Sequence, residues 1–363
     1  MSVSFLAVCM NMTAGTLKVV FPPAMPLYSR DTLTICVAGD MMMHSAQIEN
    51  ARTTQGYDFS GYFRHLEDRI GKADIAIANM EFTLAGEPHT GYPSFSAPDS
   101  YAEYLAECGF DIFLAANNHI YDKGSAGARR TVSIFKELSS TYGIRFCGLA
   151  ENHEDLEAST PLVVIAKGIR IALINFTYGT NLGSGSRWPK VNYMNEKTLI
   201  EQALRKSEET DLTLVLPHWG TEYSLNHSQQ QEDTALWLAE NGADVIIGTH
   251  PHVPQDFETL TRREVPVVYS LGNAVSNMSA PNTQLGLMTT IRIVREPDGD
   301  TEVLPIQFTY TWCSRPGGYC SSYTVLPVKE FIGRKEQWQN GTDYDRMLST
   351  YQRVKKTIGI EDN

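Results

Sequence analysis

Imidazole, carboxylate and amide side chains gather in six short segments of this sequence, and all three groups bind divalent metal ions or transfer protons. The segments are Gly39-Asp40, Asn79-Met80-Glu81, Asn117-Asn118-His119, His218-Trp219-Gly220-Thr221-Glu222, His250-Pro251-His252 and Ser270-Leu271-Gly272-Asn273. Four of the nine histidines lie in them, whereas none of the six cysteines does. Such ligands without thiolate favour Zn²⁺, Mn²⁺ or Fe²⁺ in a catalytic site with an open position. The ion would activate a water molecule or polarise a substrate oxygen.

Each segment taken alone also has an ordinary structural explanation. An aspartate after a strand commonly caps a helix, an asparagine forms turns, and a lone histidine is often a hydrogen-bonded core residue. The joint occurrence of the six segments favours a site. In His250-Pro251-His252 the proline stiffens a turn that directs two imidazoles at neighbouring positions. The two can bind one ion together, or each can bind one of two ions.

The elements that must position these segments are short apolar runs typical of β-strands. We expect strands at residues 34–38, 74–78, 111–115, 162–165, 169–175, 212–216, 245–247 and 267–270. Amphipathic patterns predict helices at 126–139, 196–207 and 230–241, and the alternation of the two is typical of a layered α/β domain. In such sheets ligands bind beyond the carboxyl ends of the strands. The six polar segments should therefore converge on one crevice.

Composition argues for a large globular fold and against a nucleic-acid-binding protein. The 363 residues include 30 Lys+Arg and 42 Asp+Glu, a net charge of −12, and no basic run is present. Binding to phosphates needs a basic face. With 42% hydrophobic residues the chain can bury its own core, so a metal would serve chemistry rather than hold the fold together.

The N-terminal residues and the cysteines give little information about the cellular compartment of the protein. Residues 1–10 are mildly apolar but lack a basic start, so they resemble at most an imperfect export signal. No apolar run approaches the ~20 residues of a membrane span. Cys313 and Cys320 flank a turn and are either bridged or two free thiols. The sequence favours a cell-envelope or exported protein, with a cytoplasmic location left open.

These motifs, in this order, resemble the calcineurin-like metallophosphoesterase superfamily, and specifically its CapA-like branch of poly-γ-glutamate capsule biosynthesis proteins. The resemblance covers residues 34–277 and adds Asp122, Tyr178-Gly179-Thr180-Asn181 and Tyr223 to the segments above. It implies an α/β fold, a four-layer α/β/β/α sandwich, with the metal centre at the strand ends. On this basis residues 1–30 precede a CapA-like domain at 31–330, and a peripheral C-terminal helix follows at 331–363.

The resemblance also assigns roles position by position. It implies metal binding by Asp40, Glu81, Asn118, His218, His250 and His252. It makes His119 the general acid. Two departures matter: Met42 stands where the phosphatases have a histidine, and Glu81 replaces their bridging aspartate. Either Glu81 substitutes as a ligand or the site holds a single ion. His44 is an extra ligand or a helix cap.

The remaining candidates would act on substrate. Glu222 belongs to the CapA-like pattern and is either the general base or a partner that orients His218. Asparagines that would hold substrate or orient ligands are Asn79, Asn117, Asn181 and Asn273. Arg187, after the Gly- and Ser-rich loop 179–186, would meet a substrate carboxylate or remain solvated.

The leading hypothesis is therefore a CapA-type hydrolase or transferase with one or two divalent ions. It would act on an amide- or carboxylate-containing polymer or peptide-like substrate, alongside capsule or polymer synthesis machinery and without nucleic acid. The alternatives are a metallophosphoesterase and a non-catalytic, metal-stabilised subunit of a polymer synthesis or export machine.

Overall fold

The computed structural model describes residues 32–260, 263–296 and 299–363. The segment 1–30, where an imperfect export signal was predicted, lies outside the described residues. Cys313 is buried and Cys320 is partly buried, and both are free thiols. Of the two alternatives left open for this pair, the structure has the free thiols.

The larger of two main sheets is built around β1, the first strand of the described chain. Its strands are β1 (Thr32–Met41), β4 (Ile75–Met80), β5 (Ile112–Leu114), β6 (Arg145–Cys147), β15 (Asn273–Val275), β16 (Leu285–Arg295), β17 (Thr301–Val303), β18 (Gln307–Ser314) and β19 (Thr324–Pro327). The order is β19-β18-β16-β1-β4-β5-β6, with β15 paired to β1 and β17 to β16. Strands β1, β4, β5 and β6 run parallel, so their carboxyl ends share one edge.

The second sheet is formed by strands between residues 162 and 268, and it also contains a set of parallel strands. It contains β8 (Leu162–Ala166), β9 (Ile169–Thr177), β11 (Leu212–His218), β12 (Val245–Ile247), β13 (Phe257–Leu260) and β14 (Val265–Val268). Their order is β13-β14-β12-β11-β9-β8, and the four strands β9, β11, β12 and β14 are parallel. Two short ribbons complete the strands: β2 (Arg52–Thr53) pairs with β3 (Gly56–Tyr57), and β7 (Leu149–Ala150) pairs with β10 (Lys190–Val191). Every run predicted as a strand overlaps one of these.

Helices cover the outer faces of both sheets. The helices of the described chain are α1 (Ser45–Ala51), α2 (Glu67–Lys72), α3 (Asp99–Glu107), α4 (Gly124–Tyr142), α5 (His153–Ser159), α6 (Lys197–Ser207), α7 (Gln229–Glu240), α8 (Val328–Phe331) and α9 (Gly341–Ile358), with a 3₁₀ turn at Lys335–Gln337; α8 and α9 pack instead on the cluster between the sheets. None of the helices in the described part of the chain combines the length and apolar character needed to cross a membrane.

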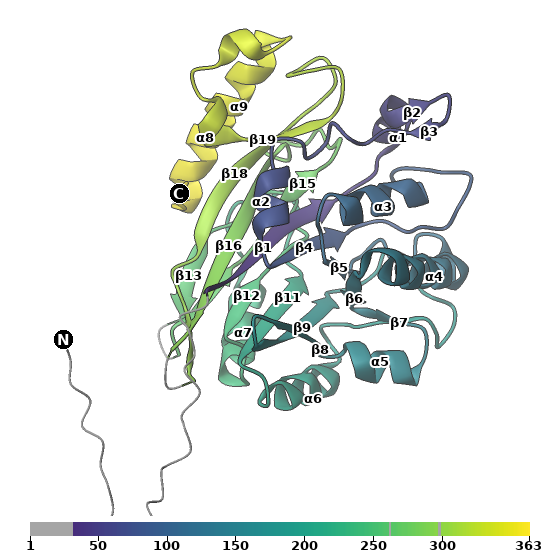
Figure 1. Cartoon of the computed structure of the whole chain (residues 1–363), viewed down its shortest axis with the longest axis vertical. Helices are drawn as coiled ribbons and strands as arrows, with labels where there is room; N and C mark the ends of the chain where they lie inside the picture. Colours follow the sequence, from purple (N-terminus) through teal and green to yellow (C-terminus); the bar gives the residue numbers. More distant parts are fainter. Residues whose placement is uncertain (1–31, 261–262, 297–298) are drawn as a thin grey trace, which may run out of the picture.

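Three separate apolar clusters define the layers. The facing sides of the two sheets pack together through residues such as Val37 and Leu214. Helices α2, α3 and α4 pack on the outer face of the larger sheet, for example Phe135 in the same cluster as Ala76. Helices α6 and α7 cover the second sheet in a third cluster. The predicted four-layer α/β/β/α sandwich is thereby confirmed (Figure 1).

The C-terminal helix differs from its prediction. The polar composition of 331–363 indicates a peripheral helix, but α9 packs on β16 and β18 and closes the side of the core that the second sheet leaves open. Met347, Tyr351, Val354 and Ile358 recur at helical spacing and are buried. The charged residues that suggested exposure occupy the opposite face, as in any amphipathic helix.

The end of β1 meets the loop before β15 in a very close backbone contact. The Asp40 N–H donates a 2.9 Å hydrogen bond to the Gly272 carbonyl oxygen, and the β1 register shifts between Ala38 and Asp40. A Cβ atom on Gly39 would lie 1.9 Å from that same oxygen. Only glycine at position 39 therefore lets the two segments bring Asp40 and Asn273 together.

We expect Gly39→Ala to lower the free energy of unfolding by about 1–3 kcal/mol, because the added methyl group has no room beside a backbone atom. The measurement is chemical denaturation of the purified variant. Gly71→Ala is the matched control: its Cβ would meet nothing within 4 Å, and alanine inside helix α2 should stabilise by about 0.5–1 kcal/mol. Equal stability of the two variants would contradict the proposed tight contact.

Candidate metal centre

The predicted ligands come together where the carboxyl ends of strands from both sheets meet. Pairing of β1 with β4 sets Asp40 beside Asn79, and pairing of β1 with β15 sets Asp40 beside Asn273. From the second sheet, His218 ends β11 and forms a parallel bridge to Thr249, just before His250. The architecture thus brings residues separated by more than 200 positions into one centre, as the parallel-strand argument predicts.

The base of this centre is buried and its ligand atoms are close together. Glu81 Oε1 lies 3.8 Å from His218 Nε2 and 3.7 Å from His252 Nε2. His252 Nδ1 lies 3.4 Å from Asp40 Oδ2. Two groups have ligand atoms all within 4.8 Å of one another: Glu81 with His218 and His250, and Asp40 with Glu81 and His252. Such spacing allows the members of each group to share one ion.

The surroundings of the Glu81 carboxylate indicate whether these residues could bind a cation. Its side chain is fully buried, and neither carboxylate oxygen has a hydrogen-bond partner among the described residues. Burial, followed by the nearby Asp40 and Glu222, raises the pKa of Glu81 well above its usual value. A buried carboxylate without a hydrogen-bonding or charged partner is strongly disfavoured. A divalent cation among these residues would supply what Glu81 lacks.

The histidine rings of the centre are also suited to binding a divalent cation. Burial, followed by neighbouring histidines, lowers the pKa of His218 and of His250 well below the usual value, so both rings are neutral at physiological pH. Neutral imidazole is the form that binds metal. The Nδ1 atom of His250 is buried without a hydrogen-bond partner in the described structure. The donor set therefore fits a divalent ion.

Several asparagines orient these ligands. Asn79 donates to Asp40 Oδ1 at 2.7 Å and lies 3.2 Å from His218 Nδ1. Asn273 Oδ1 lies 3.0 Å from His252 Nδ1. Asn118 Oδ1 lies 2.8 Å from His218 Nε2, a separation that two ligands of one ion can have. Partners of this kind fix the direction of ligating rings.

Three of the predicted substrate-binding residues lie inside the protein. Asn79, Asn117 and Asn273 are all buried, and their side chains already contact protein atoms. Asn117 donates to the Met80 carbonyl at 2.8 Å and accepts from the His119 N–H at 3.1 Å. These contacts favour the orienting alternative for Asn79 and Asn273, and Asn117 supports the turn before His119.

The other two predicted substrate residues are exposed. Asn181 donates its backbone N–H to the Asn118 carbonyl, and its side-chain amide lies 3.3 Å from His119 Nδ1. It therefore stands at the edge of the centre. Arg187 lies on the loop surface with its guanidinium 5.8 Å from the Trp188 ring centroid. The structure brings Asn181 to the site and does not bring Arg187 to it.

His119 is held by a carboxylate. Its Nδ1 lies 2.8 Å from Asp122 Oδ2, which also accepts the Phe95 N–H at 2.8 Å. A carboxylate accepts hydrogen bonds, so this contact favours the ring proton on Nδ1 and leaves Nε2 to exchange a proton. His44 has a different place: its N–H donates to Gln47 Oε1 at 2.9 Å at the start of α1. The capping alternative for His44 therefore holds.

An exposed rim surrounds the buried base. The Tyr178 ring lies 4.4 Å from the His250 ring and the Tyr223 ring 6.2 Å from the His252 ring, measured between centroids. Glu222 is exposed, yet its ligand atom lies within 4.8 Å of those of His250 and His252. Glu222 could thus share an ion with them, a role that the sequence interpretation did not assign to it.

Sequence reasoning gave Tyr178 and Tyr223 no role, although both belong to the motifs that carried the resemblance. A second sign is visible in the backbone. Tyr223, His250 and His252 have positive φ angles of 66°, 101° and 60°. Strained backbone in residues other than glycine is concentrated at functional sites. The tyrosines therefore belong with the imidazoles they face.

Comparison with known proteins identifies a matching family. The sequence model of the family described as bacterial capsule synthesis protein PGA_cap matches residues 34–278. Capsule biosynthesis protein CapA of Bacillus anthracis is 29% identical over 290 residues, covering 76% of this chain and 67% of that protein. PGA biosynthesis protein CapA of Bacillus subtilis is 25% identical over 295 residues, covering 78% and 74%.

A solved structure aligns over most of the chain at low similarity. The calcineurin-like phosphoesterase YfkN from Bacillus subtilis covers 92% of this chain and 100% of its own, with 12% identity and a TM-score of 0.47. A likeness of this degree supports no conclusion about activity.

Replacement of the Glu81 carboxyl group should change the free energy of unfolding in opposite directions with and without metal. After treatment with a chelator, Glu81→Gln should raise the free energy of unfolding, because the wild type must either bury an unpaired charge or take up a proton at Glu81 on folding. The gain should grow as pH rises above about 4.3, since a raised folded-state pKa makes the wild type less stable at higher pH.

In excess metal the order should reverse. A ligand at about 100 times its Kd stabilises the wild type by about 2.7 kcal/mol, and the variant should lose most of this. Chemical denaturation with chelator and with Zn²⁺ or Mn²⁺ measures both effects. Glu209→Gln, an exposed change, is the control. A variant that keeps the full metal-induced stabilisation would rule out Glu81 as a ligand.

Proposed function

The chain belongs to the bacterial capsule synthesis protein family PGA_cap, and from that premise we propose that it is a metal-dependent hydrolase or transferase of capsule-polymer metabolism. Its substrate in this proposal is an amide-linked or carboxylate-bearing chain of the poly-γ-glutamate kind, in keeping with the relatives named for capsule and PGA biosynthesis. One observation carries the proposal: Glu81 is a fully buried, unpartnered carboxylate among three histidines.

The proposed ion is zinc, manganese or iron, because the donors are nitrogen and oxygen without sulfur. The residues that would hold it are Asp40, Glu81, Asn118, His218, His250 and His252. Glu81 belongs to two of the ligand groups, and Glu222 with His250 and His252 forms a third, so the centre has donors for one ion or two. When bound, the ion would supply Lewis acidity that polarises a substrate oxygen and favours ionisation of water.

We place the proton transfers by the chain's own residues between the buried ligands and the exposed residues around them. His119 would transfer a proton through Nε2 while Asp122 holds its other nitrogen. Glu222 would act as the base on the open side, or as a ligand. Asn181, beside His119, would contact the substrate, and Tyr178 and Tyr223 would border the reacting group.

Location and partners follow from the family rather than from the site. We propose association with the cell envelope and with capsule or polymer synthesis proteins, which the names of the relatives, capsule and PGA biosynthesis proteins, support.

Glu222→Gln separates the possible roles of this residue. If Glu222 is the base, the variant should keep its metal and lose hydrolysis of a γ-linked glutamate oligomer by about 10²–10⁴-fold. Metal is measured by inductively coupled plasma mass spectrometry and turnover by amine release. Glu209→Gln, an exposed glutamate elsewhere, is the control and should change neither quantity.

Other outcomes have distinct meanings. Loss of about one equivalent of metal in Glu222→Gln would assign Glu222 as a ligand. Unchanged turnover with full metal would rule out both roles. Turnover of a phosphodiester instead of the glutamate oligomer would replace the substrate class. Absence of turnover in the metal-loaded wild type would favour a non-catalytic subunit.

Asp122→Asn should slow the same reaction without altering the metal content. An amide in place of the carboxylate no longer favours the ring proton on Nδ1, and we expect kcat to fall by about 10²-fold or more. Because Asp122 acts through His119, the double variant Asp122→Asn/His119→Gln should be no slower than His119→Gln alone. Additive losses would show that Asp122 acts independently of His119.

A further inference from the structure

A cavity outside the metal centre is lined by three arginines. It has a volume of about 420 Å³ and lies between α9 and the segment that joins β15 to β16. Arg315 comes from the turn after β18, whereas Arg346 and Arg353 come from α9. Asn282, Gln284 and Thr350 supply further polar groups.

These arginines lack acidic partners. No Asp or Glu of the described residues forms an ion pair with any of them, whereas Arg130, Arg295 and Lys335 all do. Arg315 donates to the Met278 carbonyl, but its Nε is buried without a partner. Arg353 donates only to a neutral amide oxygen, that of Asn282, at 2.5 Å. In a chain of net charge −12, such a cluster is an unusual concentration of positive charge.

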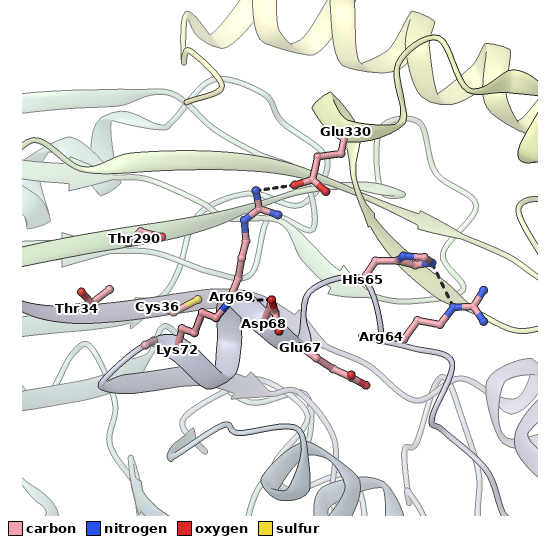
Figure 2. Close-up of a pocket in the computed structure, with 11 residues that line it drawn as sticks. Thr34, Cys36, Arg64, His65, Glu67, Asp68, Arg69, Lys72, Thr290 and Glu330 are labelled. Atoms are coloured by element: carbon pink, nitrogen blue, oxygen red, sulfur yellow. Dashed lines mark hydrogen bonds and ion pairs between the residues drawn. The ribbon is translucent and has the colours of Figure 1, made fainter.

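Another cavity of the same molecule shows the contrast. It measures about 640 Å³ and also contains basic residues, but there Arg69 pairs with Glu330 and Lys72 pairs with Asp68, each at 2.7 Å (Figure 2). Its positive charge is largely balanced within the chain. The arginines of the smaller cavity remain available to an anion from outside.

The spacing of the arginines indicates a ligand with several charges. Arg346 and Arg353 are seven residues apart on α9, which places them on one face at a separation of about 10 Å along the axis. Arg315 faces the same cavity from another element. A chain with repeated anionic groups could place a separate group against each of these guanidinium groups.

The cavity is connected to the metal centre through residues 273–278. The side-chain amide of Asn273 lies 3.5 Å from Met278 Sδ, and the Met278 carbonyl accepts the hydrogen bond from Arg315. The same Asn273 contacts the proposed ligand His252 through its other side-chain atom, at 3.0 Å. One short segment of the chain therefore reaches from the metal centre to the lining of the cavity.

We propose that Arg315, Arg346 and Arg353 form a second subsite that binds carboxylates of an acidic polymer while another part of the same chain lies at the metal centre. The choice of carboxylates rests on the proposed function, because guanidinium groups bind carboxylate and phosphate alike. Nucleic acid is disfavoured: Trp312 lines the cavity but is only 1% exposed, so it offers no ring for base stacking.

The test is binding of a fluorescent γ-linked glutamate oligomer, measured by anisotropy at low salt. Arg346→Gln/Arg353→Gln should weaken binding about tenfold or more and reduce the salt dependence. Both residues are exposed on α9, so the variant should fold, which thermal unfolding checks. The control is Arg205→Gln/Lys206→Gln, an equal charge change on exposed residues of α6 at the far end of the molecule (Figure 1).

A metal-free variant separates this inference from the proposed function. His250→Ala/His252→Ala should lose metal but keep most of the binding that depends on the α9 arginines. Unchanged binding by the α9 variant, or equal loss in the α6 control, would overturn the subsite even if the metal-dependent reaction is found. Stronger competition by polyphosphate or by a single-stranded oligonucleotide than by unlabelled glutamate oligomer would overturn the carboxylate assignment.

Discussion

Two carboxylates buried between the sheets are the constraint on which the site depends. Asp40 and Glu81 have no exposed surface, and each lies near the ring of His218, which burial keeps neutral. Asp40 receives hydrogen bonds from Asn79 and from the His250 N–H, whereas Glu81 receives none from the described residues. The sandwich therefore buries a carboxyl group whose ionised form has no partner among the described residues, and a cation would stabilise that form.

The fold tolerates this arrangement because the surrounding backbone is closely constrained. Parallel strands from two sheets end at the same place, and the contact between Gly39 and Gly272 holds the segments of Asp40 and Asn273 together. His250 and His252 keep left-handed backbone conformations, which cost about 1–3 kcal/mol each and persist only where the surroundings determine them. The apolar clusters on either side of each sheet provide that rigidity.

Much of this could be predicted from local patterns, because short apolar runs followed by polar residues mark parallel strands and the edge where they meet. The same reasoning located His218 and His250 correctly at strand ends. It could not separate buried from exposed amides: Asn117 and Asn181 look alike in sequence, yet tertiary packing buries one and exposes the other. The buried face of α9 was missed because its apolar residues are interspersed with charged ones.

The proposed arginine subsite would let an acidic protein bind an acidic polymer. A net charge of −12 repels a polycarboxylate at long range. At physiological salt, however, this repulsion is largely screened at separations beyond about 8 Å. Contacts at shorter range then decide binding. Arg315, Arg346 and Arg353 meet in space from separate parts of the chain, so no basic run reveals them in the sequence. The overall charge limits where the polymer can bind and does not exclude it as a ligand.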